Sequence, residues 1–129
     1  MASLTQYLED QILNWLKGST FASAPTNVYV DLLDGSGNSI LSTITGSANR
    51  QSITFGTITT DGTGRIMANS TDITFTASAV GGATAVSASV HDAQTGGNEL
   101  ARETLASSKT ISAADEVKFS AGNLTFKMD

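Results

Sequence analysis

The chain of 129 residues has no cysteine, one proline and one histidine. The lack of cysteine excludes disulfides, thiolate nucleophiles and the thiolate ligands of most structural zinc sites. Aromatic residues make up only 6% of the chain, and Leu, Ile, Val and Phe together make up about a fifth of it. Because the net charge is only −5, this composition predicts a folded domain with a thin core rather than a disordered chain.

Basic residues and long apolar runs are also scarce. Seven Lys and Arg residues stand against twelve Asp and Glu residues, so there is no basic surface to attract a phosphate backbone, and we expect no nucleic-acid partner. No stretch reaches the roughly 18 to 20 apolar residues that a membrane crossing needs, and the N-terminus lacks the pattern of a secretion signal. These absences predict a soluble protein made without a secretion signal and without a membrane partner.

The first 18 residues carry a helical pattern. Over residues 4–16 most apolar residues recur at a spacing of three and four, which is typical of an amphipathic helix. Ser3 and Gln6 can form a capping box at its start, and Gly18 is suited to ending it in a left-handed conformation. The apolar residues of this segment are Leu4, Tyr7, Leu8, Ile12, Leu13, Trp15 and Leu16.

Leu13 lies outside the main apolar stripe, opposite Leu4 and Trp15. Two arrangements remain open. In the first, the helix packs across the sheet or its end and Leu13 meets a nearby loop. In the second, the helix lies between this protein and a neighbour, with Trp15 as the anchor, because tryptophan is enriched among interface hot spots. The second arrangement makes Leu13, Trp15 and Leu16 the candidate interface.

After a connector over residues 19–26, the apolar period changes to two, which is the period of a strand. Residues 27–33, 39–44 and 51–58 form the first strands, with a turn at 34–38. A turn at 59–64 and a loop at 77–85 separate later strands, and Val86, Ala88 and Val90 share one face. After a turn at 95–98, a strand at 99–105 leads through a polar link to a short strand around Ile111. In all, about eight short strands predict an all-β fold, an antiparallel two-layer β-sandwich at 27–129 that forms a single domain with the helix at 1–18.

The residues that carry chemistry do not form a recognisable catalytic or metal-binding set. His91 and Asp92 are neighbours on a strand and therefore point to opposite faces, which is the wrong geometry for a base and its orienting acid. Asp34, Ser36 and Asn38 have the spacing of the first calcium ligands, but the positions for the required Gly and Glu are Ser39 and Thr45. We therefore expect no enzyme activity, no catalytic residue, no cofactor and no metal site.

Six segments in order along the chain resemble a family of small bacteriophage virion proteins, labelled capsid cement, decoration or tail fiber proteins. Ala114 stands where that family often has glycine. The resemblance implies a β-sandwich present in many copies in the virion, with no catalytic residues. The segments that carry it are SLTQYLEDQIL (3–13), NVYVDL (27–32), NRQSITF (49–55), HDAQTGGNEL (91–100), SKTISAADEVKF (108–119) and AGNLTF (121–126).

From this resemblance we expect a capsid cement or decoration protein that binds and stabilises the assembled shell. The alternative is a phage tail or tail fiber structural component. The expected partners are the major capsid protein, or tail proteins, and copies of the same chain. The expected location is the virion, on the capsid exterior, after synthesis in the host cytoplasm.

Overall fold

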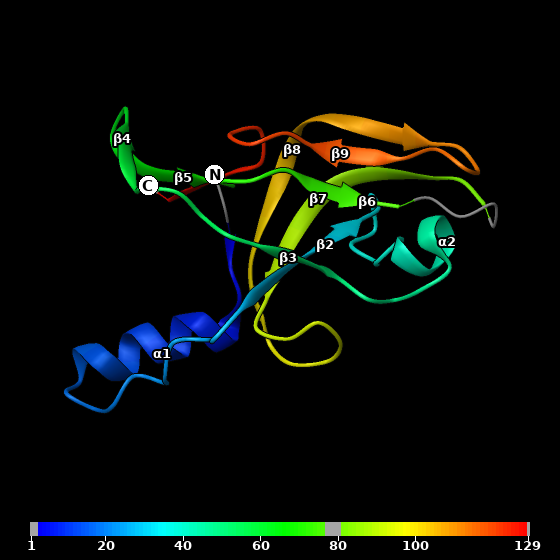
Figure 1. Ribbon diagram of the computed structural model, residues 1–129. Helices are drawn as coiled ribbons and strands as arrows, with labels where there is room; N and C mark the ends of the chain where they lie inside the picture. Colours follow the sequence, from blue (N-terminus) through cyan, green and yellow to red (C-terminus); the bar gives the residue numbers. More distant parts are fainter. Residues whose placement is uncertain (1–2, 77–80, 129) are drawn as a thin grey trace.

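The computed structural model describes residues 3–76 and 81–128. One layer of the fold is an antiparallel sheet of five strands in the order β1-β8-β7-β2-β3 (Figure 1). Val30, Val90 and Ala101 lie side by side across its centre. The strands are β1 (Ser3–Leu4), β8 (Glu99–Ile111), β7 (Ala83–His91), β2 (Val28–Leu33) and β3 (Gln51–Ile53).

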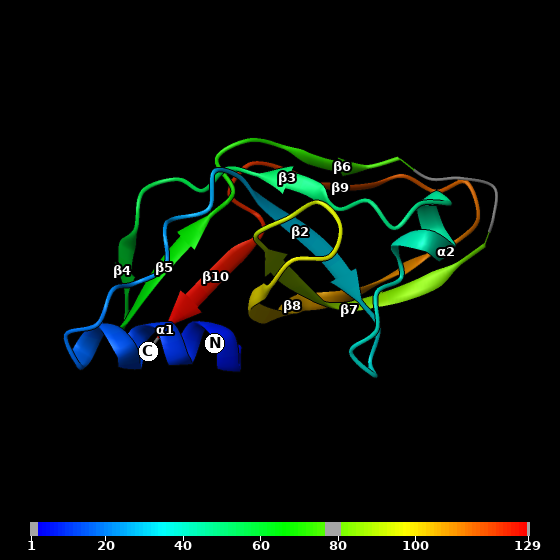
Figure 2. The same ribbon diagram turned by 90° about the horizontal axis from the view of Figure 1, so that it is seen from below.

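The second layer consists of two smaller antiparallel sheets. One pairs β6 (Ile73–Phe75) with β9 (Val117–Phe119), and the other has the order β10-β5-β4. Their strands are β10 (Thr125–Met128), β5 (Gly64–Ala68) and β4 (Thr59–Asp61). Figure 2 shows β6 and β9 across from β7 and β8. The predicted all-β, antiparallel, sandwich-like fold with a small N-terminal helix is confirmed.

The core lies between these layers. Val30 and Leu32 on one face of β2 are fully buried and contact apolar side chains of the second layer. The aromatic rings meet edge to face, with centroids 6.5 Å apart for Phe75 and Phe119. Such edge-to-face contacts add to the stabilisation that comes from burying the rings. The core is thus small but continuous.

Asn69 ties the ends of the second-layer strands together. Its side chain is buried, its Nδ2 donates to the carbonyl oxygens of Thr71, Phe119 and Ser120, and its Oδ1 accepts from the backbone N–H of Leu124 at 2.9 Å. Because a buried amide is costly unless it is hydrogen-bonded, these bonds fix how the two small sheets meet.

Several predicted elements differ from the observed ones. Residues 41–45 form a short helix, α2 (Leu41–Thr45), where we predicted a strand at 39–44. Ile40, Leu41 and Ile44 are buried, a spacing that suits one helical turn, and Gly46 ends the helix at φ 75°. The strand prediction was wrong because a segment this short shows no full period.

In the second half of the chain, the strands are longer than predicted. β7 begins at Ala83, inside the predicted loop at 77–85, and residues 77–80 lie outside the described part. An irregularity in the pairing between Ala85 and Ser87 shifts the alternation, so Ala85 takes the core position predicted for Val86. β8 runs without a break to Ile111, where we predicted a strand at 99–105 and a polar link.

The strands β1 and β4 were not predicted. β4 occupies part of the predicted turn at 59–64, and each of its residues is exposed, so it carries no apolar alternation. The described residues thus form ten strands, compared with the prediction of about eight.

The helix α1 (Gln6–Leu16) stands away from both layers (Figure 1). Its N-cap is Thr5 rather than Ser3, because Ser3 belongs to β1 and pairs with Arg102 of β8. Gly18 has φ 87°, and its N–H donates to the carbonyl oxygen of Trp15, as expected for a helix that ends at a left-handed glycine. None of the residues of α1 is buried.

Candidate interaction surface

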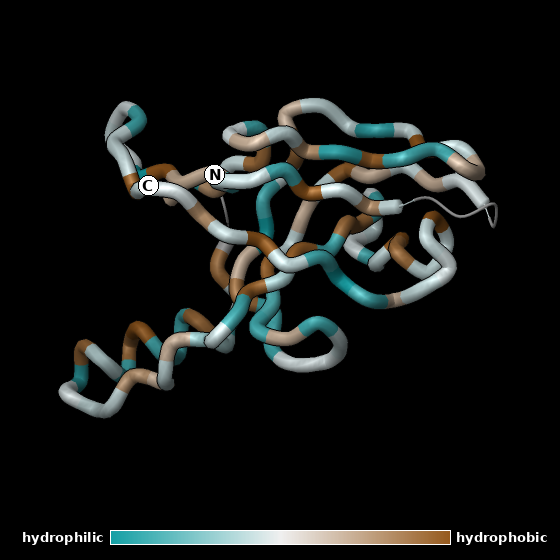
Figure 3. The backbone as a smooth tube through the Cα atoms, in the orientation of Figure 1, coloured by the Kyte–Doolittle hydropathy of each residue, from teal (hydrophilic) through white to brown (hydrophobic). Residues whose placement is uncertain are grey.

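The far end of α1 presents large apolar side chains to solvent. The exposed fractions are 57% for Leu13, 61% for Trp15 and 67% for Leu16. We call these three residues the helix tip. Figure 3 shows the hydrophobic segments along this projecting helix. The structure leaves the three candidate interface residues uncovered, so Leu13 is not buried against a loop of the same chain.

The first turn of α1 is held more firmly than its end. Thr5 Oγ1 donates to the carbonyl oxygen of Leu100, 3.1 Å away, and the N–H of Thr5 donates to the same carbonyl. The connector returns along the helix, where the N–H of Ala22 donates to Gln11 Oε1 at 2.9 Å. The helix and connector thus form an arm that is attached to the sandwich at one end.

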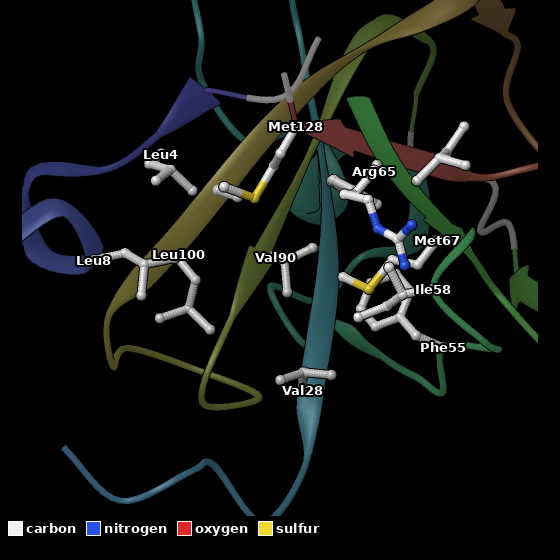
Figure 4. Close-up of a pocket in the computed structure, with 13 residues that line it drawn as sticks. Leu4, Leu8, Val28, Phe55, Ile58, Arg65, Met67, Val90, Leu100 and Met128 are labelled. Carbon is white, nitrogen blue, oxygen red and sulfur yellow. The ribbon is translucent and has the colours of Figure 1, made fainter. Parts of the chain in front are cut away.

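An apolar groove of about 310 Å³ lies beside the attached end of the arm (Figure 4). It opens where the three-stranded sheet and the five-stranded sheet meet, and side chains of both sheets line it. We call it the apolar groove, and its 13 lining residues are Leu4, Leu8, Val28, Phe55, Ile58, Arg65, Ile66, Met67, Val90, Leu100, Ala101, Phe126 and Met128.

Two walls of the groove are more exposed than its floor. Ile58 is 55% exposed and Met128 is 45% exposed, whereas Val90 and Phe126 are buried. Leu4 and Leu8 come from the start of the arm, so the apolar stripe of α1 begins inside the groove. By helical spacing, the same stripe continues through Ile12 to Trp15 outside it.

Arg65 is the charged residue among those that line the groove. It pairs in register with Met128, and its Nη1 donates to Thr60 Oγ1. Among the described residues, no ion pair involves Arg65. The groove therefore combines apolar walls with one guanidinium that makes no ion pair with a carboxylate of residues 3–76 or 81–128.

A polar cluster lies on the face of the five-stranded sheet that points away from the second layer. Ser89 Oγ is 2.8 Å from His91 Nε2, and Glu99 Oε1 is 3.9 Å from the same nitrogen. In a catalytic triad the acid and the nucleophile contact different ring nitrogens, and here Ser89 is also fully buried. Burial, followed by the nearby Arg50 guanidinium, lowers the pKa of His91. This geometry suits a structural histidine.

The neighbouring Asp31 and Arg50 brace the turn that precedes β8. Arg50 Nε donates to Asp31 Oδ2 at 3.2 Å, and Arg50 Nη1 donates to the carbonyl oxygens of Ala93 and Gly96. The same turn is held by Asp92, whose carboxylate accepts from the backbone N–H of Asn98, an interaction that lowers the pKa of Asp92. These charged groups are used to hold loops together.

The predicted turn at 34–38 also uses its carboxylate internally. Asp34 Oδ1 accepts from the backbone N–H groups of Ser36 and Asn38 at 2.9 and 3.0 Å. This is an Asx turn, in which an aspartate side chain imitates a backbone turn. Over residues 3–76 and 81–128, no group of three or more His, Asp or Glu side chains is placed to hold a metal ion.

The sequence singled out the residues of the helix tip as a candidate interface in one of two arrangements, but it did not indicate the groove. Its lining residues come from segments between Leu4 and Met128 that are far apart along the chain, so periodicity within one segment carries no signal for it. The one available hint was that Ile58 and Met128 are large apolar residues at strand ends, where turn residues are expected.

Comparison with known proteins identifies the family of the chain. Within the described part of the chain, no helix is long and apolar enough to cross a membrane. No curated protein matches the chain. A family model described as podophage GP4 fiber I protein gp80 matches residues 3–127. The chain therefore belongs to this family of phage fiber proteins, as a structural protein of the phage virion.

Proposed function

We propose that this protein is a component of a phage tail fiber that joins the virion through protein contacts and has no catalytic role. The observation that carries the proposal is the family match over residues 3–127, since the matching family is described as a fiber protein. The match favours the tail-fiber alternative over the capsid cement function that we expected first.

The interaction surface supports the same proposal. A folded monomer rarely exposes several large apolar side chains together, and such a surface is typical of a contact with another chain. Here the apolar groove lies at the attached end of the arm, and the helix tip lies at the far end of the same helix. A contact that forms only in the assembled virion lowers the free energy of the assembled state relative to the separate proteins.

The test is to locate and count the protein in purified virions. We expect quantitative mass spectrometry to give a small copy number relative to the major capsid protein, and we expect the protein to stay with the tail fraction when heads and tails are separated. A copy number comparable to that of the major capsid protein, with the protein in the head fraction, would contradict the tail-fiber proposal and support the cement function.

A further inference from the structure

We infer that a second copy of this chain occupies the apolar groove, and that it does so with the helix tip. The inference names a partner for the proposed function. It rests on that function only in assuming that the copies meet in a tail fiber. The contact would place Leu13, Trp15 and Leu16 of one copy against the groove walls of the next.

The first argument is that the molecule exposes two apolar surfaces. Among the described residues, the exposed large hydrophobic side chains are those of the helix tip, the adjacent Phe21, and Ile58 and Met128 of the groove. One set projects and the other lines a concavity of about 310 Å³. A projecting apolar element and a hollow apolar surface on the same chain are what a contact between copies requires.

The second argument is that the arm cannot fill the groove of its own chain. Leu4 and Leu8 at the start of the arm already form part of the groove lining. Trp15 lies seven residues beyond Leu8, which is about 10 Å further along a helix axis. Figure 1 shows α1 running away from the sandwich beyond this point. The helix tip is therefore available only to another molecule.

The third argument is charge. Glu9 precedes Leu13 by four residues and Leu16 by seven, so it shares their face of the helix. Glu9 is exposed, and among the described residues no ion pair involves it. Within the described part of the chain, Arg65 of the groove also has no carboxylate partner. A helix tip that enters a neighbouring groove brings a carboxylate toward this guanidinium, and complementary charges of this kind set the register of an interface.

The experiment is a charge exchange between two full-length variants, Glu9→Arg and Arg65→Glu, measured by sedimentation velocity over a concentration series. We expect the wild-type protein to self-associate. Each variant alone sets like charges against each other, and we expect its self-association to weaken about tenfold or more. In an equimolar mixture both contacts become Arg against Glu, and we expect association to return to about the wild-type level.

A matched control keeps the result specific. Glu116 is exposed, is not among the groove-lining residues and makes no ion pair among the described residues. Glu116→Arg therefore makes the same change in charge as Glu9→Arg, but outside the proposed contact. We expect Glu116→Arg to associate as the wild type does. Circular dichroism melting of all variants checks that each one is folded before its association is compared.

Three results would overturn the inference: a wild-type protein that stays monomeric at every concentration, single variants that associate like the wild type, or a mixture that does not recover. Incorporation into virions is scored separately. A monomeric protein found in the tail fraction would reject the contact between copies while keeping the tail-fiber function. A self-associating protein that is absent from virions would reject the function alone.

Discussion

The fold lowers the pKa of His91 and therefore opposes protonation of its imidazole. Burial, and then the Arg50 guanidinium, hold its pKa below the ordinary value of 6.5, although Glu99, Asp31 and Asp92 pull in the opposite direction. In the pH range between the folded-state pKa and 6.5, the unfolded chain therefore binds more protons than the folded chain. The stabilising effect of the neutral imidazole is complete above this range and is lost as the pH falls through it.

We expect the free energy of unfolding, measured by urea titration, to fall between about pH 7 and pH 5 for this reason. In a His91→Gln variant this part of the decrease is expected to be smaller. Asp72 and Asp92, whose pKa values are lowered from 3.8, act in a separate and more acidic range. An equal slope in both proteins from pH 7 to pH 5 would show that His91 is not the responsible group.

Ala114 adopts a backbone conformation that suits glycine. Its φ is 68°, and among the described residues it is the one non-glycine residue with positive φ. We expect Ala114→Gly to raise the free energy of unfolding by about 0.5 to 1 kcal/mol, because it removes the Cβ strain.

Ala113→Gly is the natural control for this change, since Ala113 is exposed in the same turn and has no positive φ. There the added backbone freedom of the unfolded chain is the main effect, so we expect a small loss of stability. Urea denaturation of the two variants side by side gives the comparison. Equal effects at both positions would mean that the strain at Ala114 is negligible.

At the scale of elements, only the first part of the apolar stripe of α1 contacts the rest of the chain, and the remainder is exposed. Because Trp15 is 61% exposed, we expect Trp15→Ala to change the free energy of unfolding by less than about 0.5 kcal/mol. We expect the same variant to lose self-association and incorporation into virions, measured by sedimentation and by mass spectrometry of purified particles.

Phe75→Ala serves as the contrasting variant. Phe75 is 1% exposed and packs edge to face on Phe119, so its truncation is expected to cost about 3 to 5 kcal/mol. If Trp15→Ala instead unfolds the monomer as Phe75→Ala is expected to do, then the helix belongs to the core and not to an interface.

Elements with a long and regular apolar pattern were predictable, and short or exposed ones were not. The helix was found because its apolar residues recur over three turns, and β2 because Val28, Val30 and Leu32 alternate. The five residues of α2 and the exposed residues of β4 show no such pattern, and the pairing irregularity near Ala85 reverses the alternation within β7. Local sequence carries no direct record of such tertiary adjustments.

At the scale of the whole molecule, the sandwich class was predictable and the groove was not. Turn residues between short alternating strands favour a two-layer antiparallel fold whatever the strand order. The groove opens where the three-stranded sheet meets the five-stranded sheet, and the three-stranded sheet is itself held to the neighbouring two-stranded sheet by contacts such as those of Asn69 with Phe119 and Leu124. Those contacts join positions about 50 residues apart, so only the folded structure reveals them.

The arm leaves and rejoins the sandwich at the same end, and this arrangement has a mechanical consequence. The helix α1 has 11 residues and is therefore about 16 Å long, so a rotation of about 10° at its base moves Trp15 by on the order of 3 Å. The proposed contact between copies would thus follow modest changes in the angle between neighbouring subunits. In the proposed fiber, such angular tolerance would let identical chains occupy positions that are not geometrically equivalent.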